Sequence, residues 1–180
     1  MATVARPPVV RTCASRVESG LFVRRLPPFY ERRSVRPGPI LLVAREYAAR
    51  PRSDFQPVPG RLHRYYPQKL LVLVRARSVV TVTVPRSEHH FALLYGRADW
   101  RIPYSRGYRL ADGERAVTFH ACRESEPSFV PGSRRMVGRW TEFNGGVIVA
   151  GARCVTLDVR VHGRTRGSRT HLSFGAGRCT

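Results

Sequence analysis

The sequence contains almost no lysine. Arginine supplies 31 of the 32 basic residues, and Lys69 is the remaining one. Asn144 is the only asparagine, and isoleucine occurs at three positions. Arginine has GC-rich codons, whereas lysine, asparagine and isoleucine have AT-rich ones. The arginine content therefore reflects a GC-rich coding sequence as much as selection for a ligand, and it does not by itself identify a partner.

Acidic residues are also scarce, at 12 in the whole chain. Paired carboxylates of the kind that catalyse hydrolysis are correspondingly hard to find. Glu124 and Glu126 lie together, but Arg123 beside them is typical of a solvated loop. The sequence has no GxSxG, HExxH, catalytic-cysteine, phosphate-loop or dinucleotide pattern. We therefore predict no catalytic residues and no cofactor.

No apolar run is long enough to span a bilayer. The longest, at 40–44 and 70–74, have five residues each, against the roughly 20 that a membrane helix needs. Residues 1–10 also lack the apolar core of a signal peptide. The sequence thus predicts no transmembrane segment and shows no leader as written.

The four cysteines, Cys13, Cys122, Cys154 and Cys179, contain no CxxC pair. An even number at wide spacing favours disulfides over a zinc site. Paired cysteines imply an oxidising compartment, so we predict an extracellular or cell-envelope protein. The missing leader then requires an upstream start codon or an unusual export route.

The favoured connectivity is Cys154–Cys179 with Cys13–Cys122, which would tie the N-terminal segment to the rest of the chain. Cys122–Cys154 with Cys13–Cys179 is the first alternative, since strands at 115–122 and 153–162 would then be neighbours. The third connectivity also stays open. His120, His162 and His171 could join the cysteines around a metal, but the spacing matches no zinc or copper pattern, and no metal site is predicted.

The net charge is +20, and it is spread evenly. Residues 1–60 and 61–120 each have 11 basic and 4 acidic residues (+7), and 121–180 have 10 and 4 (+6). A nucleic-acid binder usually concentrates its charge in an arm or on one element, so this pattern disfavours nucleic acid. Tyr65, Tyr66, Trp100, Tyr104 and Tyr108 lie among arginines and could stack on bases, but packing within a β domain is the favoured interpretation.

The pattern of apolar residues predicts an all-β fold. Residues 1–39, rich in proline and arginine, should form an irregular extension, and 40–180 a single β-sandwich domain. The stretch 40–50 fits either a strand or helical turns, and 122–140 should be a long loop. We expect an antiparallel sandwich, immunoglobulin-like or related, of about seven to eight strands. The predicted strands are 69–76 and 79–84 (as a hairpin), 89–96, 115–122, 145–151, 154–161 and 170–174.

The C-terminal strands predict a second hairpin. If Cys154 lies opposite Cys179, then Val159 lies opposite Phe174 and Val161 opposite Leu172, with all four apolar residues facing inward. The weak point is the GAG at 175–177, which would interrupt the ladder before Cys179. The exposed tip of this hairpin would carry Arg164, Arg166 and Arg169, the predicted contacts for a polyanion.

Three segments, VTFHACRESEPSF, VGRWTEFNGGVIVAGARCVTLDVRVHGR and LSFGAGRC, are similar to the C-terminal half of predicted-exported actinobacterial proteins whose function is not established. The resemblance covers roughly residues 115–179, with a looser match near YPQKLLVLVRA. It implies export and a disulfide-bearing β domain.

These observations predict a non-enzymatic, exported or cell-envelope domain with a structural or binding role. Its partner would be a cell-envelope polymer or protein. The alternative is a protein that binds nucleic acid or another polyanion through its arginine-rich surface. A third hypothesis is that the protein is an enzyme whose site lies on the loops at 97–114 or 123–144.

Overall fold

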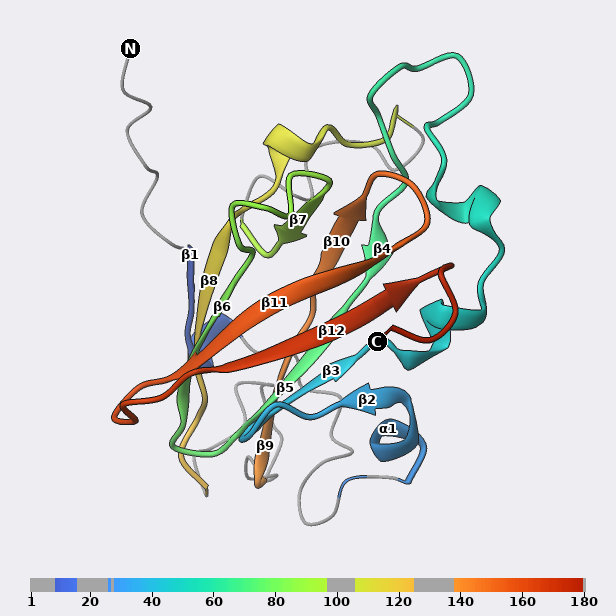
Figure 1. Cartoon of the computed structure of the whole chain (residues 1–180). Helices are drawn as coiled ribbons and strands as arrows, with labels where there is room; N and C mark the ends of the chain where they lie inside the picture. Colours follow the sequence, from blue (N-terminus) through green and yellow to red (C-terminus); the bar gives the residue numbers. More distant parts are fainter. Residues whose placement is uncertain (1–8, 16–25, 27, 97–105, 125–137, 180) are drawn as a thin grey trace, which may run out of the picture.

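The computed structural model describes residues 9–15, 26, 28–96, 106–124 and 138–179, and these form three β-sheets (Figure 1). The five-stranded sheet has the order β1 (Val9–Arg11), β8 (Ala116–His120), β6 (Val79–Thr83), β11 (Arg153–Val161), β12 (Ser168–Phe174). The four-stranded sheet has the order β2 (Ser34–Val35), β3 (Ile40–Val43), β5 (Leu71–Arg75), β9 (Trp140–Phe143). The three-stranded sheet has the order β4 (Gln68–Lys69), β10 (Gly146–Val149), β7 (Phe91–Leu94).

The described helices are short. They are α1 (Pro28–Arg33) and the 3₁₀ helices η1 (Cys13–Ser15), η2 (Arg45–Ala49), η3 (Arg52–Phe55) and η6 (Leu110–Asp112). The stretch 40–50, which fitted a strand or helical turns, contains both, since β3 leads directly into η2. The described part of the Pro/Arg-rich residues 1–39 contributes β1, η1, α1 and β2, of which β1 runs parallel to β8.

The sheets pack face to face around one apolar core, as predicted for an all-β sandwich of antiparallel strands. In Figure 1, β11 and β12 cross in front of the strands of the two smaller sheets. Alternate residues of β6 and β11 point into this core, because successive side chains of a strand face opposite sides. The core draws on all three sheets and includes Val80, Val82, Val117, Leu157, Leu172, Phe174, Ile40, Val72, Phe143, Phe91 and Val147.

The central strand β5 is buried on both faces, as its continuous apolar run predicted. Val72 and Val74 face the main core. Leu71 and Leu73 face the other way, where they form a second cluster with Leu26. A third cluster covers the outer face of the three-stranded sheet, around Leu94, Ile148 and Tyr108.

The predicted hairpin of 69–76 and 79–84 is wrong. β5 pairs with β3 and β9, whereas β6 pairs with β8 and β11 in the opposite sheet. Arg77, between them, has a positive φ of 65°. Both faces of β5 are apolar, and a strand in the middle of the four-stranded sheet is covered on both faces. The short connection from β5 to β6 therefore crosses from this sheet to the five-stranded sheet.

The sheets also exchange strands at Asn144–Gly145. β9 belongs to the four-stranded sheet and β10, three residues on, to the three-stranded sheet. A Cβ on Gly145 would lie 2.3 Å from a ring carbon of Tyr95 and 2.7 Å from the carbonyl oxygen of Leu94. The glycine thus lets the chain pass against β7. The predicted long loop at 122–140 ends one residue too late, because Trp140 begins β9; of this loop, residues 125–137 lie outside the described part.

The predicted register of the C-terminal hairpin is wrong. Val159 pairs with Ser168, six residues before Phe174, and Cys154 pairs with Ser173. An even shift leaves every side chain on the same face, so the alternation of apolar residues cannot distinguish the two registers. Gly175 and Gly177 have positive φ angles of 65° and 73°, and their N–H groups bond to carbonyls of η2, so the ladder ends at Phe174.

Both disulfides of the favoured connectivity are present. The Cα atoms of Cys154 and Cys179 lie 5.7 Å apart, because the glycine turn brings the chain back to β11. Those of Cys13 and Cys122 lie 4.8 Å apart, and this disulfide joins the residues after β1 to the residues after β8. Disulfides of this kind form in an oxidising compartment.

Candidate anion-binding surface

Some arginines hold the fold together and are not available to a ligand. The guanidinium of Arg115 donates hydrogen bonds to the carbonyl oxygens of Glu88 (2.8 Å), Phe91 (3.0 Å), Val84 (3.1 Å) and Pro85. Desolvation by burial lowers the pKa of Arg115, while the charge of Glu88 acts in the opposite direction. This side chain therefore ties together the carbonyl groups of the segment between β6 and β7, of which those of Pro85 and Glu88 also accept backbone N–H groups.

Other arginines are paired with carboxylates. Arg33 contacts Glu46 at 2.6 Å, and Arg50 contacts Asp54 at 3.5 Å. Arg169, one of the three predicted polyanion contacts, donates to Asp158 on the neighbouring strand at 2.9 Å. Its charge is offset locally, so Arg169 is the weakest of the three predicted contacts.

A further group of arginines comes together at one end of the sandwich. We call this group the basic end, and it consists of Arg36, Arg75, Arg77, Arg123 and Arg139, all exposed. Backbone hydrogen bonds join the segments that carry them. The N–H of Arg75 bonds to Pro39 (2.8 Å), that of Ala76 to Arg139 (2.8 Å) and that of Arg77 to Cys122 (3.0 Å).

Most of this charge has no carboxylate partner. Among the described residues, Arg36, Arg75, Arg77 and Arg139 make no ion pair. Arg36 instead lies over the ring of Trp140, with 5.4 Å from the guanidinium carbon to the ring centroid. This contact leaves the N–H groups at the guanidinium edge open to an anion. Glu124, next to Arg123 in sequence, is the acidic residue nearest along the chain.

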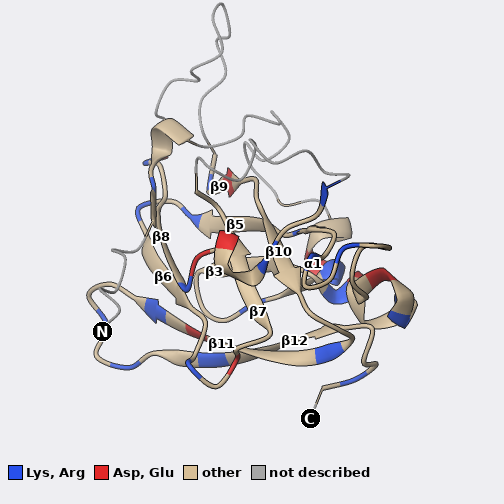
Figure 2. Ribbon diagram, turned by 90° about the horizontal axis from the view of Figure 1, so that it is seen from above, with Lys and Arg blue, Asp and Glu red and all other residues tan. Residues whose placement is uncertain are grey.

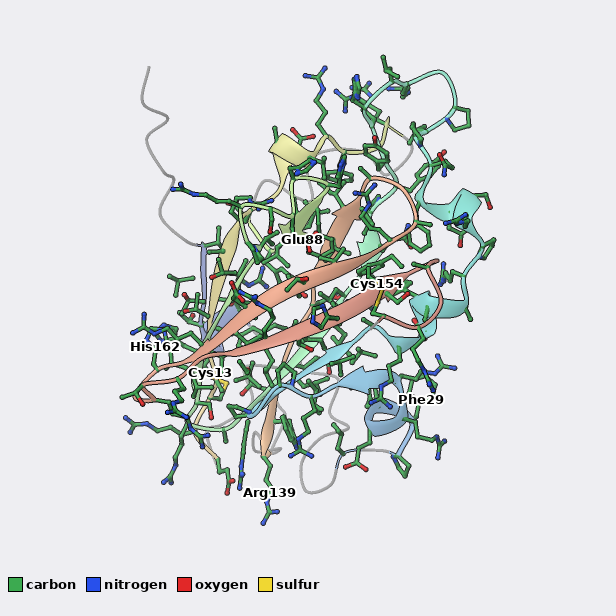
Figure 3. The ribbon with its side chains drawn as sticks, in the orientation of Figure 1. Cys13, Phe29, Glu88, Arg139, Cys154 and His162 are labelled. Carbon is green, nitrogen blue, oxygen red and sulfur yellow. A yellow bond between two sulfur atoms is a disulfide. The ribbon has the colours of Figure 1, made fainter. Side chains whose placement is uncertain are left out.

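The tip of the C-terminal hairpin lies at the same end. The N–H of His162 bonds to the carbonyl of Val79 at 2.9 Å, two residues after Arg77. A Cβ on Gly38 would lie 3.9 Å from Val161, which places the base of the hairpin beside the segment of Arg36. Arg164 and Arg166 are exposed on the tip. In Figure 3, His162 lies at the left of the molecule and Arg139 at the bottom.

Like charges on neighbouring segments add to the electrostatic potential that an anion experiences, since the Debye length is about 8 Å at physiological ionic strength. Basic segments are present elsewhere too, and Figure 2 shows them on strands and turns with few acidic ones between. What distinguishes the basic end is that strand ends distant in sequence converge there. Sequence reasoning missed it because only the sheet order shows which strand ends meet.

Other candidates from the sequence have structural explanations where the structure describes them. Tyr108 is buried and Tyr65 packs against it, as the packing interpretation predicts; Trp100 and Tyr104 lie outside the described residues. All four cysteines are in disulfides, and no group of three metal-binding side chains occurs in the described part of the chain. Burial raises the pKa of Tyr30, and the charge of Glu142 raises it further. No helix in the described ranges is long and apolar enough to cross a membrane.

The rings of His89 and His90 contact each other at a tilt of 46° before β7 begins. Adjacent residues of a strand point to opposite faces, but these two residues precede β7 and their ring centroids lie 4.1 Å apart. Desolvation lowers the pKa of His90 below its ordinary value of 6.5, and the charges of Arg153 and His89 lower it further, against an opposite effect of Glu88.

Acidification is therefore expected to destabilise the fold through His90. The unfolded chain takes up a proton at a higher pH than the folded protein, so this contribution is complete above about pH 6.5 and is lost progressively as the pH falls below it. Urea unfolding at pH 8 and pH 5 measures the difference. The variant His90→Gln should reduce this difference in stability between the two pH values. The control His120→Gln, at an exposed position on β8, should leave the difference unchanged. An equal reduction by both variants would contradict the assignment to His90.

The fold and this surface define a class: a disulfide-bonded, all-β protein with a cluster of exposed arginines at one end. Comparison of the chain with protein-family models, with curated protein sequences and with solved structures finds no match. The similarity to exported actinobacterial proteins stays a prediction from the sequence.

Proposed function

We propose that the protein is a non-enzymatic binding domain, exported or held in the cell envelope, that binds an anionic polymer through the basic end and the hairpin tip. The observation that supports this most directly is the convergence of Arg36, Arg75, Arg77 and Arg139, which form no ion pairs among the described residues. The ligand class is a chain bearing repeated phosphate or carboxylate groups, because guanidinium groups bind both in a planar, bidentate way.

The geometry favours an extended ligand over a small one. The arginines come from four separate segments on strand ends and a hairpin, so they present charges along a surface. The two disulfides support an extracellular setting, where envelope polymers are accessible. Nucleic acid also carries repeated phosphates, so the experiment must distinguish it from an envelope polymer.

Binding should depend on these arginines and on salt. The test compares wild type with the triple variant Arg77→Gln, Arg139→Gln, Arg164→Gln, using fluorescence anisotropy of labelled polyphosphate. We expect the variant to bind about 10- to 100-fold more weakly and the slope of log K against log [salt] to fall by roughly one per lost phosphate contact.

The matched control, Arg45→Gln, Arg52→Gln, Arg86→Gln, removes the same charge from exposed positions elsewhere. Equal losses in the two triple variants would show that net charge alone attracts the polymer and would overturn the proposed surface. A DNA duplex that binds more tightly than polyphosphate at physiological salt would replace the envelope polymer by nucleic acid.

A further inference from the structure

A leucine stands exposed at the tip of a well-fixed loop. We call residues 57–65 the Leu62 loop, and Leu62 is 78% exposed, more than the two other exposed large apolar residues of the described chain, Val10 (52%) and Phe29 (44%). A single exposed leucine is ordinary for a soluble domain. This one differs in that hydrogen bonds fix the backbone of its loop and basic residues lie on the loop and on its anchoring segment.

The loop has a defined backbone. Pro57 and Tyr65 form a β-bridge, and the N–H of Val58 bonds to the carbonyl of Arg64 at 2.7 Å. Within this frame the N–H of Arg61 bonds to Val58 at 2.9 Å. His63 has a φ of 58°, a conformation that side chains other than glycine rarely adopt. These turns direct Leu62 to the surface in place of packing it against the domain.

The base of the loop is anchored to the chain at 106–110. Tyr65 and Tyr108 exchange two backbone hydrogen bonds, of 2.8 and 2.9 Å. The guanidinium of Arg64 donates to the carbonyl of Gly107 at 3.1 Å. A Cβ on Gly107 would lie 2.6 Å from Val58, so the two segments are in close contact. The tip is therefore presented on a rigid support.

Basic side chains lie on the loop and on the segment that anchors its base. Arg61 and His63 flank Leu62 and are exposed, and the anchoring segment contributes the exposed Arg106 and Arg109. None of these three arginines has an ion pair with a carboxylate in the described residues. The acidic neighbour is Asp112, whose carboxylate accepts the backbone N–H of Arg109 at 2.7 Å.

We propose that the Leu62 loop docks onto a lipid bilayer that carries anionic headgroups. Leu62 enters the boundary between headgroups and acyl chains, while Arg61, Arg106 and Arg109 bind lipid phosphates. An exposed apolar side chain with basic residues on its own loop and on the adjoining segment matches the layered chemistry of an anionic membrane surface, since basic residues gain energy near anionic lipids and apolar ones below the headgroups. A polymer in water offers nothing for the leucine to enter.

This inference goes beyond the polymer-binding function and rests on separate residues. The Leu62 loop lies at the upper right of the molecule in Figure 1, and the hairpin tip between β11 and β12 lies at its lower left. The protein can therefore hold a membrane and a polymer at the same time.

Co-sedimentation with vesicles tests the inference. We use vesicles of phosphatidylcholine alone and of phosphatidylcholine with phosphatidylglycerol. Wild type should bind the anionic vesicles at least tenfold more tightly than the neutral ones, and Leu62→Ser should weaken that binding about tenfold, while Val10→Ser, the control at another exposed apolar site, should leave it unchanged. Arg61→Gln, Arg106→Gln, Arg109→Gln should reduce the preference for anionic vesicles.

The same variants separate the two proposals, because Leu62→Ser should retain wild-type binding to polyphosphate. Fluorescence of Leu62→Trp should shift to the blue on adding anionic vesicles. Equal binding to both vesicle types, equal loss in the Leu62 and Val10 variants, or no blue shift would each overturn the inference. So would loss of vesicle binding in the Arg77, Arg139 and Arg164 triple variant with retention in the Leu62 loop variants.

Discussion

Replacing Cys13 and Cys122 together by alanine is expected to lower the free energy of unfolding by about 4–5 kcal/mol. The two cysteines are 109 residues apart, so their bond closes most of the chain into one loop. In the chain-entropy account a cross-link over a longer loop removes more freedom from the unfolded state. Because the free energy of unfolding of a single domain is roughly 5–15 kcal/mol, this loss removes a large part of it.

The second disulfide provides the control for this prediction. Cys154 and Cys179 are 25 residues apart, so their double alanine variant should lose about 3–4 kcal/mol. Guanidinium unfolding of both variants under identical conditions measures the difference. A larger loss in the Cys154/Cys179 variant would mean that local strain or contacts, and not loop length, determine the effect.

Phe174→Ala is expected to lower the free energy of unfolding by about 3–5 kcal/mol. Phe174 ends β12 and is fully buried. Its ring centroid lies 5.4 Å from that of Tyr47, 5.7 Å from Phe91 and 5.9 Å from Phe55, so it joins η2, β7 and η3 to the five-stranded sheet. Truncation removes apolar burial and leaves a cavity that rings from three elements cannot close.

Phe29→Ala is the matched control for the aromatic truncation. Phe29 is 44% exposed, and its ring contacts the guanidinium of Arg33 at 4.0 Å. Its loss should reduce the free energy of unfolding by less than about 1 kcal/mol. Chemical unfolding followed by circular dichroism compares the two. Equal losses would contradict the placement of Phe174 at the centre of the core.

The sequence predicts the strands better than their partners. Val80, Val82 and Val84 alternate with threonines, and they are buried as the alternation requires. The continuous run of β5 similarly predicts burial on both faces. The sequence does not show which strands pair, because two apolar strands joined by a short link fit a hairpin and a crossing between sheets equally well.

The register of the C-terminal hairpin shows a second limit. Phe174 and Leu172 face the core in the predicted and the observed pairing alike, since the two differ by an even number of residues. The favoured cysteine pairing is nevertheless present, because Gly175 and Gly177 let the chain return to Cys154 outside the ladder.

The sequence predicts only part of the candidate surface. Arg164 and Arg166 stand on the exposed hairpin tip as their setting predicted, whereas Arg169 is paired with Asp158 across the two strands. An ion pair between strands depends on register, which the sequence left ambiguous. The basic end depends on the order of strands in two sheets, and no local pattern around Arg36 or Arg139 reveals it.

The most direct test of polymer binding is to map which arginines the polymer covers. Arginines are modified with phenylglyoxal in the presence and absence of polyphosphate, and mass spectrometry measures the extent at each position. We predict protection of Arg77, Arg139 and Arg164, with Arg45, Arg52 and Arg86 modified equally in both conditions. Uniform protection of all six, or protection confined to the second three, would contradict the account.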